Sequence, residues 1–117
     1  MEYLNRIELT GIVGSVRHID FASGRCARLA LVTNYAYTAE DGTPVIESTW
    51  HNIMAFSSEK ITCLDRIAKG SRLHVVGRPV SRRYIGQDGC ERLSFEVRAS
   101  RMELLGGSEH LQNESDK

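Results

Sequence analysis

The stretch that decides the fold is Ser48-Thr49-Trp50-His51-Asn52-Ile53-Met54-Ala55-Phe56. Its residues alternate as in a β-strand, which places one set on each face of a sheet: Trp50, Asn52, Met54 and Phe56 on one, and Thr49, His51, Ile53 and Ala55 on the other. Because both faces hold apolar groups, the pattern indicates a curved sheet with one side packed and the other open to a flat, partly apolar ligand. A simpler interpretation, in which both rings belong to the core, stays open from this stretch alone.

Two strands are expected before this stretch. The first covers residues 6–16, where Gly11 and Gly14 suit a strongly bent strand in a small barrel. A turn leads to a second strand over residues 27–34, and the two strands are predicted to form a hairpin. Residues 35–44 are expected to be a flexible loop, which carries two tyrosines and ends in a Glu-Asp-Gly turn signal and a proline.

One helix is expected after the Trp50 strand. Ser57 or Ser58 can cap its N-terminus, and Lys69-Gly70 is a typical helix end. The apolar residues between them recur at helical spacing: Ile61, Leu64, Ile67 and Ala68.

A long hairpin is predicted to follow the helix. Its outgoing strand runs from Leu73 past Pro79 to Ile85, and its return strand covers residues 93–99 after a glycine-rich turn. Proline cannot donate a ladder hydrogen bond, so we expect an edge or a bulge at Pro79 and a hairpin that projects beyond the sheet.

This order of elements predicts an all-β fold, a five-stranded OB-fold Greek-key barrel with one helix between strands 3 and 4 and a long strand 4–5 hairpin. Residues 1–105 are expected to form this domain, because 117 residues suit a single core. Residues 106–117 are rich in polar side chains and are expected to be a short flexible tail.

Composition excludes several classes of protein. No apolar run approaches the roughly 18 residues of a membrane span, and residues 1–6 lack a secretion signal, so a cytoplasmic chain is expected. Three cysteines and four histidines are scattered without metal-ligand spacing, and we expect no metal, no cofactor and no closed disulfide set. No nucleophile elbow, P-loop or paired-carboxylate motif occurs, so the chain is not expected to be an enzyme.

The charge distribution is uneven although the formal net charge is zero. Between Arg66 and Arg101 there are nine Lys and Arg residues against three acids. A polyanion responds to where charges lie, so this segment leaves room for a basic groove; a solvated surface with no ligand is the other interpretation.

Aromatic and basic residues are predicted to share one surface. The aromatic candidates are Tyr37, Trp50, Phe56 and Tyr84, and the basic candidates are Arg72, Arg78, Arg82 and Arg83. Proteins that bind single-stranded nucleic acid combine these two ingredients, because bases stack on rings at about 1 to 3 kcal/mol each while cations track the phosphates.

Three blocks carry a resemblance to a known family: residues 4–11 (LNRIELTG), residues 49–56 (TWHNIMAF) and residues 67–77 (IAKGSRLHVVG), followed by Arg82-Arg83-Tyr84. Together they resemble the bacterial single-stranded DNA-binding protein family over roughly residues 4 to 107. The resemblance implies an OB barrel that binds single-stranded DNA in replication, recombination or repair, and that is cytoplasmic and nucleoid-associated. It implies base stacking on Tyr37, Trp50, Phe56 and Tyr84, two of which, Tyr37 and Tyr84, are often tryptophan in the family.

The resemblance also bears on partners. It places His51 near a subunit contact and implies a homotetramer, with a surface strand residue as the alternative role for His51. Family members usually continue through a low-complexity linker to an acidic tip that recruits replication or repair enzymes. This chain stops at Lys117, so recruitment by that route is not expected.

Three alternatives remain open at this point. One is a dimeric adaptor of replication restart similar to primosomal replication protein N, which the chain length favours. Another is a barrel used for protein contacts, because fold does not fix the ligand. RNA binding is the third, because base stacking does not sense the 2′-hydroxyl.

Overall fold

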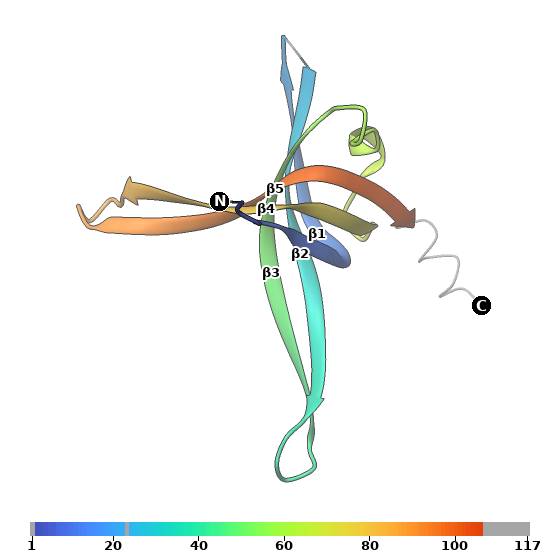
Figure 1. The fold of residues 1–117 in the computed structure, drawn as a ribbon, viewed down its shortest axis with the longest axis vertical. Coiled ribbons are helices and arrows are strands. Elements are labelled where there is room, and N and C mark those ends of the chain that lie inside the picture. Colours follow the sequence, from blue (N-terminus) through green and yellow to red (C-terminus); the bar gives the residue numbers. More distant parts are fainter. Residues whose placement is uncertain (1, 23, 107–117) are drawn as a thin grey trace.

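A computed structural model of the chain describes residues 2–22 and 24–106. It contains five strands and one short 3₁₀ turn: β1 (Ile7–Phe21), β2 (Gly24–Thr38), β3 (Pro44–Phe56), η1 (Leu64–Arg66), β4 (Arg72–Ile85) and β5 (Glu91–Gly106). The strands close into a barrel in the order β1-β2-β3-β5-β4 (Figure 1). All neighbours are antiparallel except β3 and β5. The predicted five-stranded all-β barrel is confirmed.

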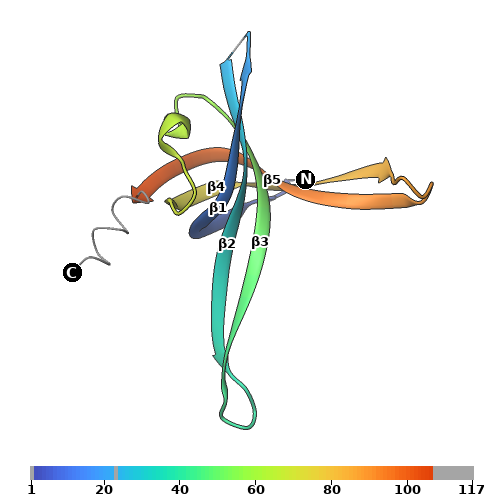
Figure 2. The same ribbon diagram turned by 180° about the vertical axis from the view of Figure 1, so that it is seen from behind.

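Two hairpins extend well beyond the barrel and point in different directions (Figures 1 and 2). We call residues 34–48 the β2–β3 arm and residues 80–95 the β4–β5 arm. A register shift between Val76 and Gly77 bends β4 before it enters its arm. The projecting strand 4–5 hairpin was therefore predicted correctly.

The prediction of a flexible loop over residues 35–44 is wrong for most of its length. β2 continues to Thr38 and β3 already starts at Pro44, so Tyr35 and Tyr37 lie on a strand. Ala36 pairs with Ile46 and Tyr37 with Val45, and such β-branched and aromatic residues favour pairing over a loop. Only the residues around Gly42, which has a φ of 87°, form the turn.

The predicted helix between strands 3 and 4 is also wrong, because this segment holds only the 3₁₀ turn η1. Apolar residues at 61, 64 and 67 repeat every three residues, a period that fits a 3₁₀ turn better than an α-helix. The proposed cap residues have other partners: Ser58 and Ile61 form an isolated bridge, and the Ser57 backbone N–H donates to the Arg25 carbonyl at 2.9 Å. Gly70 belongs to a turn with a φ of 93°.

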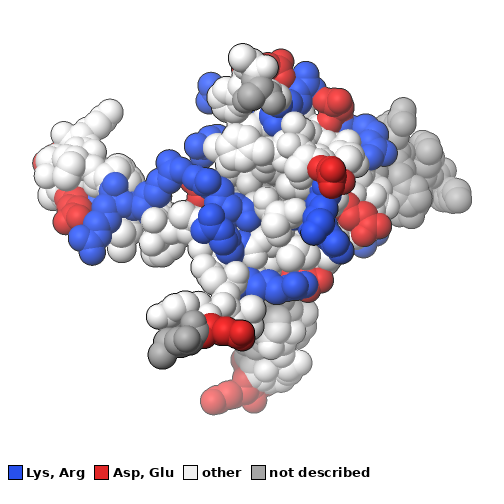
Figure 3. All heavy atoms as spheres, turned by 45° about the horizontal axis from the view of Figure 1, so that its top comes forward, with Lys and Arg blue, Asp and Glu red and all other residues white. Residues whose placement is uncertain are grey.

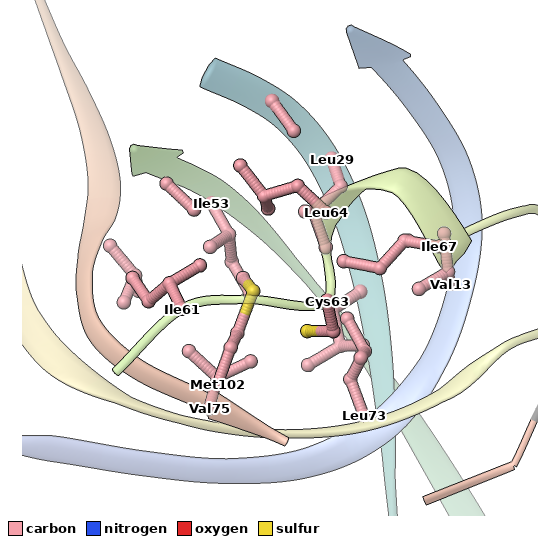
Figure 4. Packing of buried hydrophobic residues seen from close by; sticks show 14 residues of the cluster. Val13, Leu29, Ile53, Ile61, Cys63, Leu64, Ile67, Leu73, Val75 and Met102 are labelled. Carbon is pink, nitrogen blue, oxygen red and sulfur yellow. The ribbon is translucent and has the colours of Figure 1, made fainter. Parts of the chain in front are cut away.

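This irregular segment covers one opening of the barrel (Figure 4). Its residues Ile61, Cys63, Leu64 and Ile67 are buried in the same cluster as barrel residues, among them Leu29, Ile53, Leu73 and Val75. Burial raises the pKa of the Cys63 thiol. The segment therefore completes the core without needing helical geometry.

The predicted tail begins where the described chain ends. Gly106 is the last residue of β5, and residues 107–117 lie outside the described residues. Within residues 2–22 and 24–106, no helix has the length and apolar character needed to cross a membrane.

Candidate nucleic-acid interface

Trp50 lies on the outer face of the sheet, opposite the face that packs into the core. It pairs with Val32, which pairs in turn with Ile12 on β1. Its side chain is 59% exposed and its ring lies over Gly14, where a Cβ atom would come within 2.4 Å of Trp50 Cζ3. Gly14 coincides with the register shift between Val13 and Ser15 in β1. The glycine therefore bends the strand and leaves space for the indole.

Phe56 ends β3 on the same outer face. Its ring is 47% exposed and stacks on Phe21, with centroids 6.3 Å apart and planes 28° from parallel. Phe21 is half-exposed and was missed by the sequence analysis, which ended the first strand at residue 16. Extending the alternation of Arg17, Ile19 and Phe21 would have found it.

The other two predicted rings lie on the arms. Tyr84 is 49% exposed on β4 and pairs with Arg92, whereas Tyr37 is 40% exposed on β2 and lies 6.0 Å from the Tyr35 ring between centroids. None of the four candidate rings is sealed in the core. The interpretation of Trp50 and Phe56 as core residues is therefore wrong.

The rings are distributed over a wide surface. Phe56 lies six positions after Trp50 along β3, which corresponds to about 20 Å at the usual rise of a strand. Tyr37 lies on the arm that continues the same two strands, and Tyr84 lies on the other arm. By alternation along β2, Tyr37 lies on the opposite face from Val32, the partner of Trp50, whereas Tyr84 shares the face of Arg78. A single base could not touch all four rings.

Arg78 and Arg82 lie on the predicted surface. They alternate along β4 with Tyr84, so all three share one face of the strand. Arg78 also lines a groove of about 460 Å³ with Phe56, Met54 and Arg98. Lys and Arg side chains extend from the β4–β5 arm onto the barrel (Figure 3).

Arg83 and Arg72 are placed less favourably. Arg83 points to the opposite face of the β4–β5 arm, pairs with Leu93 in the ladder and makes a 3.4 Å ion pair with Glu91. Arg72 begins β4 and pairs with Ile12 on β1. Ile12 is connected through Val32 to Trp50, so Arg72 lies three strands away from the indole along the same line of paired residues. The structure brings neither arginine next to a candidate ring.

His51 lies on the face of β3 opposite Trp50. It is half-buried, and its Nε2 atom forms a 2.9 Å hydrogen bond with Thr33 Oγ1 on the neighbouring strand. This bond fixes the imidazole within the protomer and leaves its predicted place at a subunit contact untested.

The tip of the β4–β5 arm is held by one carboxylate. Asp88 accepts a hydrogen bond from the Cys90 backbone N–H at 3.1 Å and forms a 2.7 Å ion pair with Arg92. These two interactions lower the pKa of Asp88. The aromatic and basic side chains of the arm are thereby presented from an ordered turn.

Other ionic contacts involve residues outside the predicted set, one of which, Arg6, lines the same groove as Arg78 and Phe56. Arg25 forms ion pairs with Asp20, at 2.7 Å, and with Asp65, and both carboxylates raise its pKa. A His74 hydrogen bond of 2.6 Å and the Arg6 guanidinium lower the pKa of Glu8. Over the described part of the chain, no three His, Cys, Asp or Glu side chains gather as metal ligands.

Fold and surface together define the class as an OB-type barrel, with exposed rings and arginines on its outer face. A family model described as the single-strand binding protein family matches residues 4–105. The chain therefore belongs to the single-strand binding protein family, which confirms the resemblance in its sequence. This assignment favours the strand-binding interpretation over the primosomal adaptor.

Individual relatives agree with this assignment. A single-stranded DNA-binding protein of Neisseria meningitidis is 30% identical over 107 residues, which cover 89% of this chain and 61% of the relative. One from Bacteroides thetaiotaomicron is 33% identical, with 87% and 66% covered. The chain thus spans about two thirds of the length of these relatives or slightly less.

A solved structure shares the fold. The single-stranded DNA-binding protein of Plasmodium falciparum, solved in complex with single-stranded DNA, superposes with a TM-score of 0.74 at 22% identity. The match covers 91% of this chain and 96% of that one. It supports the barrel architecture.

Proposed function

We propose that this chain is a binding protein rather than an enzyme, and that its ligand is single-stranded DNA held with little sequence preference. Bases stack on Tyr37, Trp50, Phe56 and Tyr84, and phosphates pair with arginines of β4, chiefly Arg78 and Arg82. Stacking accepts any base because every base has a π face, so affinity does not depend on a fixed sequence.

The observation that carries the proposal is the exposure of Trp50, Phe56 and Tyr84 on the outer face of the strands. Arg78 lines one groove with Phe56, and Arg82 lies on the same face of β4 as Tyr84. Large apolar side chains grouped on a surface mark an interaction site, because leaving them in water is unfavourable. The Plasmodium falciparum relative, whose structure contains single-stranded DNA, further supports this ligand.

Trp50 provides the test, because it is the only tryptophan of the chain. Titration with an oligothymidine should quench its fluorescence, and the apparent affinity should fall as salt rises. Duplex DNA of the same length should bind far more weakly, since its bases are not available for stacking. Equal binding of duplex DNA contradicts the proposal, and a matched RNA oligonucleotide tests whether the sugar matters.

We also propose a homotetramer with His51 at a subunit contact, as the family resemblance implies. Sedimentation equilibrium measures the mass directly, and His51→Ala should lower the tetramer fraction. A stable dimer would instead favour the adaptor role in replication restart.

The cellular role follows from the ligand. We propose that the chain protects single strands during replication, recombination or repair, and that it lies in the cytoplasm with the nucleoid. Partner recruitment through an acidic tip is not part of the proposal.

A further inference from the structure

Four arginines lie in one row across the outer face of the barrel. Arg17 pairs with Arg28, and Arg28 pairs with Met54. Met54 pairs with Arg98, and Arg98 pairs with Arg78. The row thus crosses every strand of the barrel in spatial order: Arg17 on β1, Arg28 on β2, Met54 on β3, Arg98 on β5 and Arg78 on β4.

The row is unfavourable for the isolated chain. Arg17 faces Arg28 directly, as does Arg98 with Arg78, and like charges at paired positions destabilise a sheet. Arg98 has a partner, because it forms a 2.9 Å ion pair with Glu96, whose side chain is only 12% exposed. Within residues 2–22 and 24–106, the remaining three arginines form no ion pair. An anionic ligand bound at the row would reduce the repulsion between these arginines.

The row also lies between the stacking rings. Along β3, Trp50 is four residues before Met54 and Phe56 is two residues after it, about 13 Å and 7 Å at the usual strand rise. A groove of about 360 Å³ borders Arg17 and Arg28, and the groove of about 460 Å³ borders Arg98 and Arg78. Met54, which is buried, lies between the two pairs of arginines in the row.

We propose that the phosphodiester backbone of the bound strand crosses the barrel along this row, with Arg17, Arg28 and Arg98 as phosphate contacts in addition to Arg78. This inference rests on the proposed function. The guanidinium groups supply paired N–H donors that match phosphate oxygens, and they remain charged at all relevant pH values. Bases on either side of the backbone then reach Trp50 and the Phe21–Phe56 stack. The strand therefore runs across the β-strands rather than along them.

The first test is the double variant Arg17→Gln/Arg28→Gln. Each lost phosphate contact should reduce the magnitude of the slope of log affinity against log salt by about 0.7. This reduction corresponds to an affinity about fivefold lower at 0.1 M salt and to no change in affinity at 1 M salt. The double variant should therefore bind an oligothymidine about 25-fold more weakly at 0.1 M salt, with the Trp50 quench at saturation unchanged. The matched control is Arg66→Gln/Lys69→Gln, which removes the same charge from exposed residues outside the row and should leave the slope unchanged.

A second variant separates binding from folding. Arg17→Glu places an acid opposite Arg28, so the melting temperature should stay the same or rise while binding weakens. If the wild-type chain binds no oligonucleotide, the proposed function fails. If it binds and the double variant keeps the wild-type slope, or if the control loses as much, the arginine row is overturned and the proposed function stands.

Discussion

The two arms are built alike but carry different charges. Both are two-stranded extensions of the barrel with exposed rings, Tyr35 and Tyr37 on the β2–β3 arm and Tyr84 on the β4–β5 arm. Three acids and no Lys or Arg occur within residues 34–48, whereas three arginines and two acids occur within residues 80–95. The acids of the β4–β5 arm are both engaged by its own arginines.

This difference shows why rings alone do not define a nucleic-acid surface. An acidic arm repels phosphates, so bases that stack on Tyr37 do so without nearby cations. The β4–β5 arm supplies both ingredients, because Arg82 lies on the same face as Tyr84. We therefore expect the β4–β5 arm to contribute more to binding than the β2–β3 arm.

The largest expected effect comes from removing two rings. Trp50→Ala/Tyr84→Ala should weaken oligothymidine binding at least about 30-fold, because each base stack contributes about 1 to 3 kcal/mol. The variant Trp50→Ala/Tyr37→Ala should also weaken oligothymidine binding, but its loss of affinity should be roughly fivefold smaller. The measurement is anisotropy of a labelled oligonucleotide, since both variants lack the tryptophan.

The two double variants are matched in the number of rings removed. Leu105→Ala, an exposed apolar truncation on β5 away from the rings, controls for nonspecific effects and should bind normally. Thermal denaturation should show folded barrels throughout, because the removed side chains are exposed. Equal losses in both double variants would mean that charge does not distinguish the arms.

Charge addition on the β2–β3 arm should have a smaller effect of opposite sign. Glu40→Lys/Glu47→Lys makes this arm basic at two exposed positions. Binding at 0.1 M salt should tighten by up to about fivefold for each new phosphate contact, with a steeper salt dependence. Glu59→Lys, an exposed acid outside both arms, should change neither quantity as much. A wild-type salt slope in the double variant would show that the strand does not approach this arm.

Much of the barrel could be predicted from local pattern. The alternation around Trp50 is strict and its flanking strands have turn signals, so the order of strands along the chain followed. The same stretch left open whether Trp50 and Phe56 are exposed or belong to the core. The helix prediction failed because a period of three residues was taken for 3.6. The loop prediction failed because Tyr35 and Tyr37 find their partners, Glu47 and Val45, only after the turn at Gly42 is formed.

The candidate surface was predicted less completely. Trp50, Phe56 and Tyr84 are exposed as expected, and Arg78 and Arg82 share the face of Tyr84. Arg83 was included although alternation with Arg82 places it on the other face. The arginine row required cross-strand register, which joins residues as distant as Arg17 and Arg78 and leaves no trace in a single strand.

The smallest expected effect concerns the two arm tips, each of which contains an aspartate that accepts a backbone N–H two residues ahead. Asp41 accepts from Thr43 at 3.0 Å and Asp88 accepts from Cys90, and in both cases these bonds lower the pKa. Only Asp88 has an arginine partner as well, Arg92. Arg92→Gln should therefore raise the pKa of Asp88 toward its ordinary value and leave that of Asp41 unchanged, as measured by NMR titration of the two carboxyl groups.

The sign of the accompanying stability change follows from linkage. A carboxyl group whose pKa is lowered by folding stabilises the folded state above its unfolded-state pKa, and that contribution is lost as the pH falls through the lowered value. Acid should thus loosen the β4–β5 tip for two reasons: protonated Asp88 loses its ion pair with Arg92, and its hydrogen bond from the Cys90 N–H becomes weaker. The β2–β3 tip has no such ion pair among the described residues, so acid weakens only the bonds between Asp41 and Thr43. Amide exchange of Cys90 should accordingly rise more steeply below about pH 4 than that of Thr43 in the wild-type chain. In Arg92→Gln the increase in amide exchange should begin at a higher pH for Cys90 and at an unchanged pH for Thr43. An equal pH shift for Thr43 would show that the charge difference between the arms does not affect the stability of their turns.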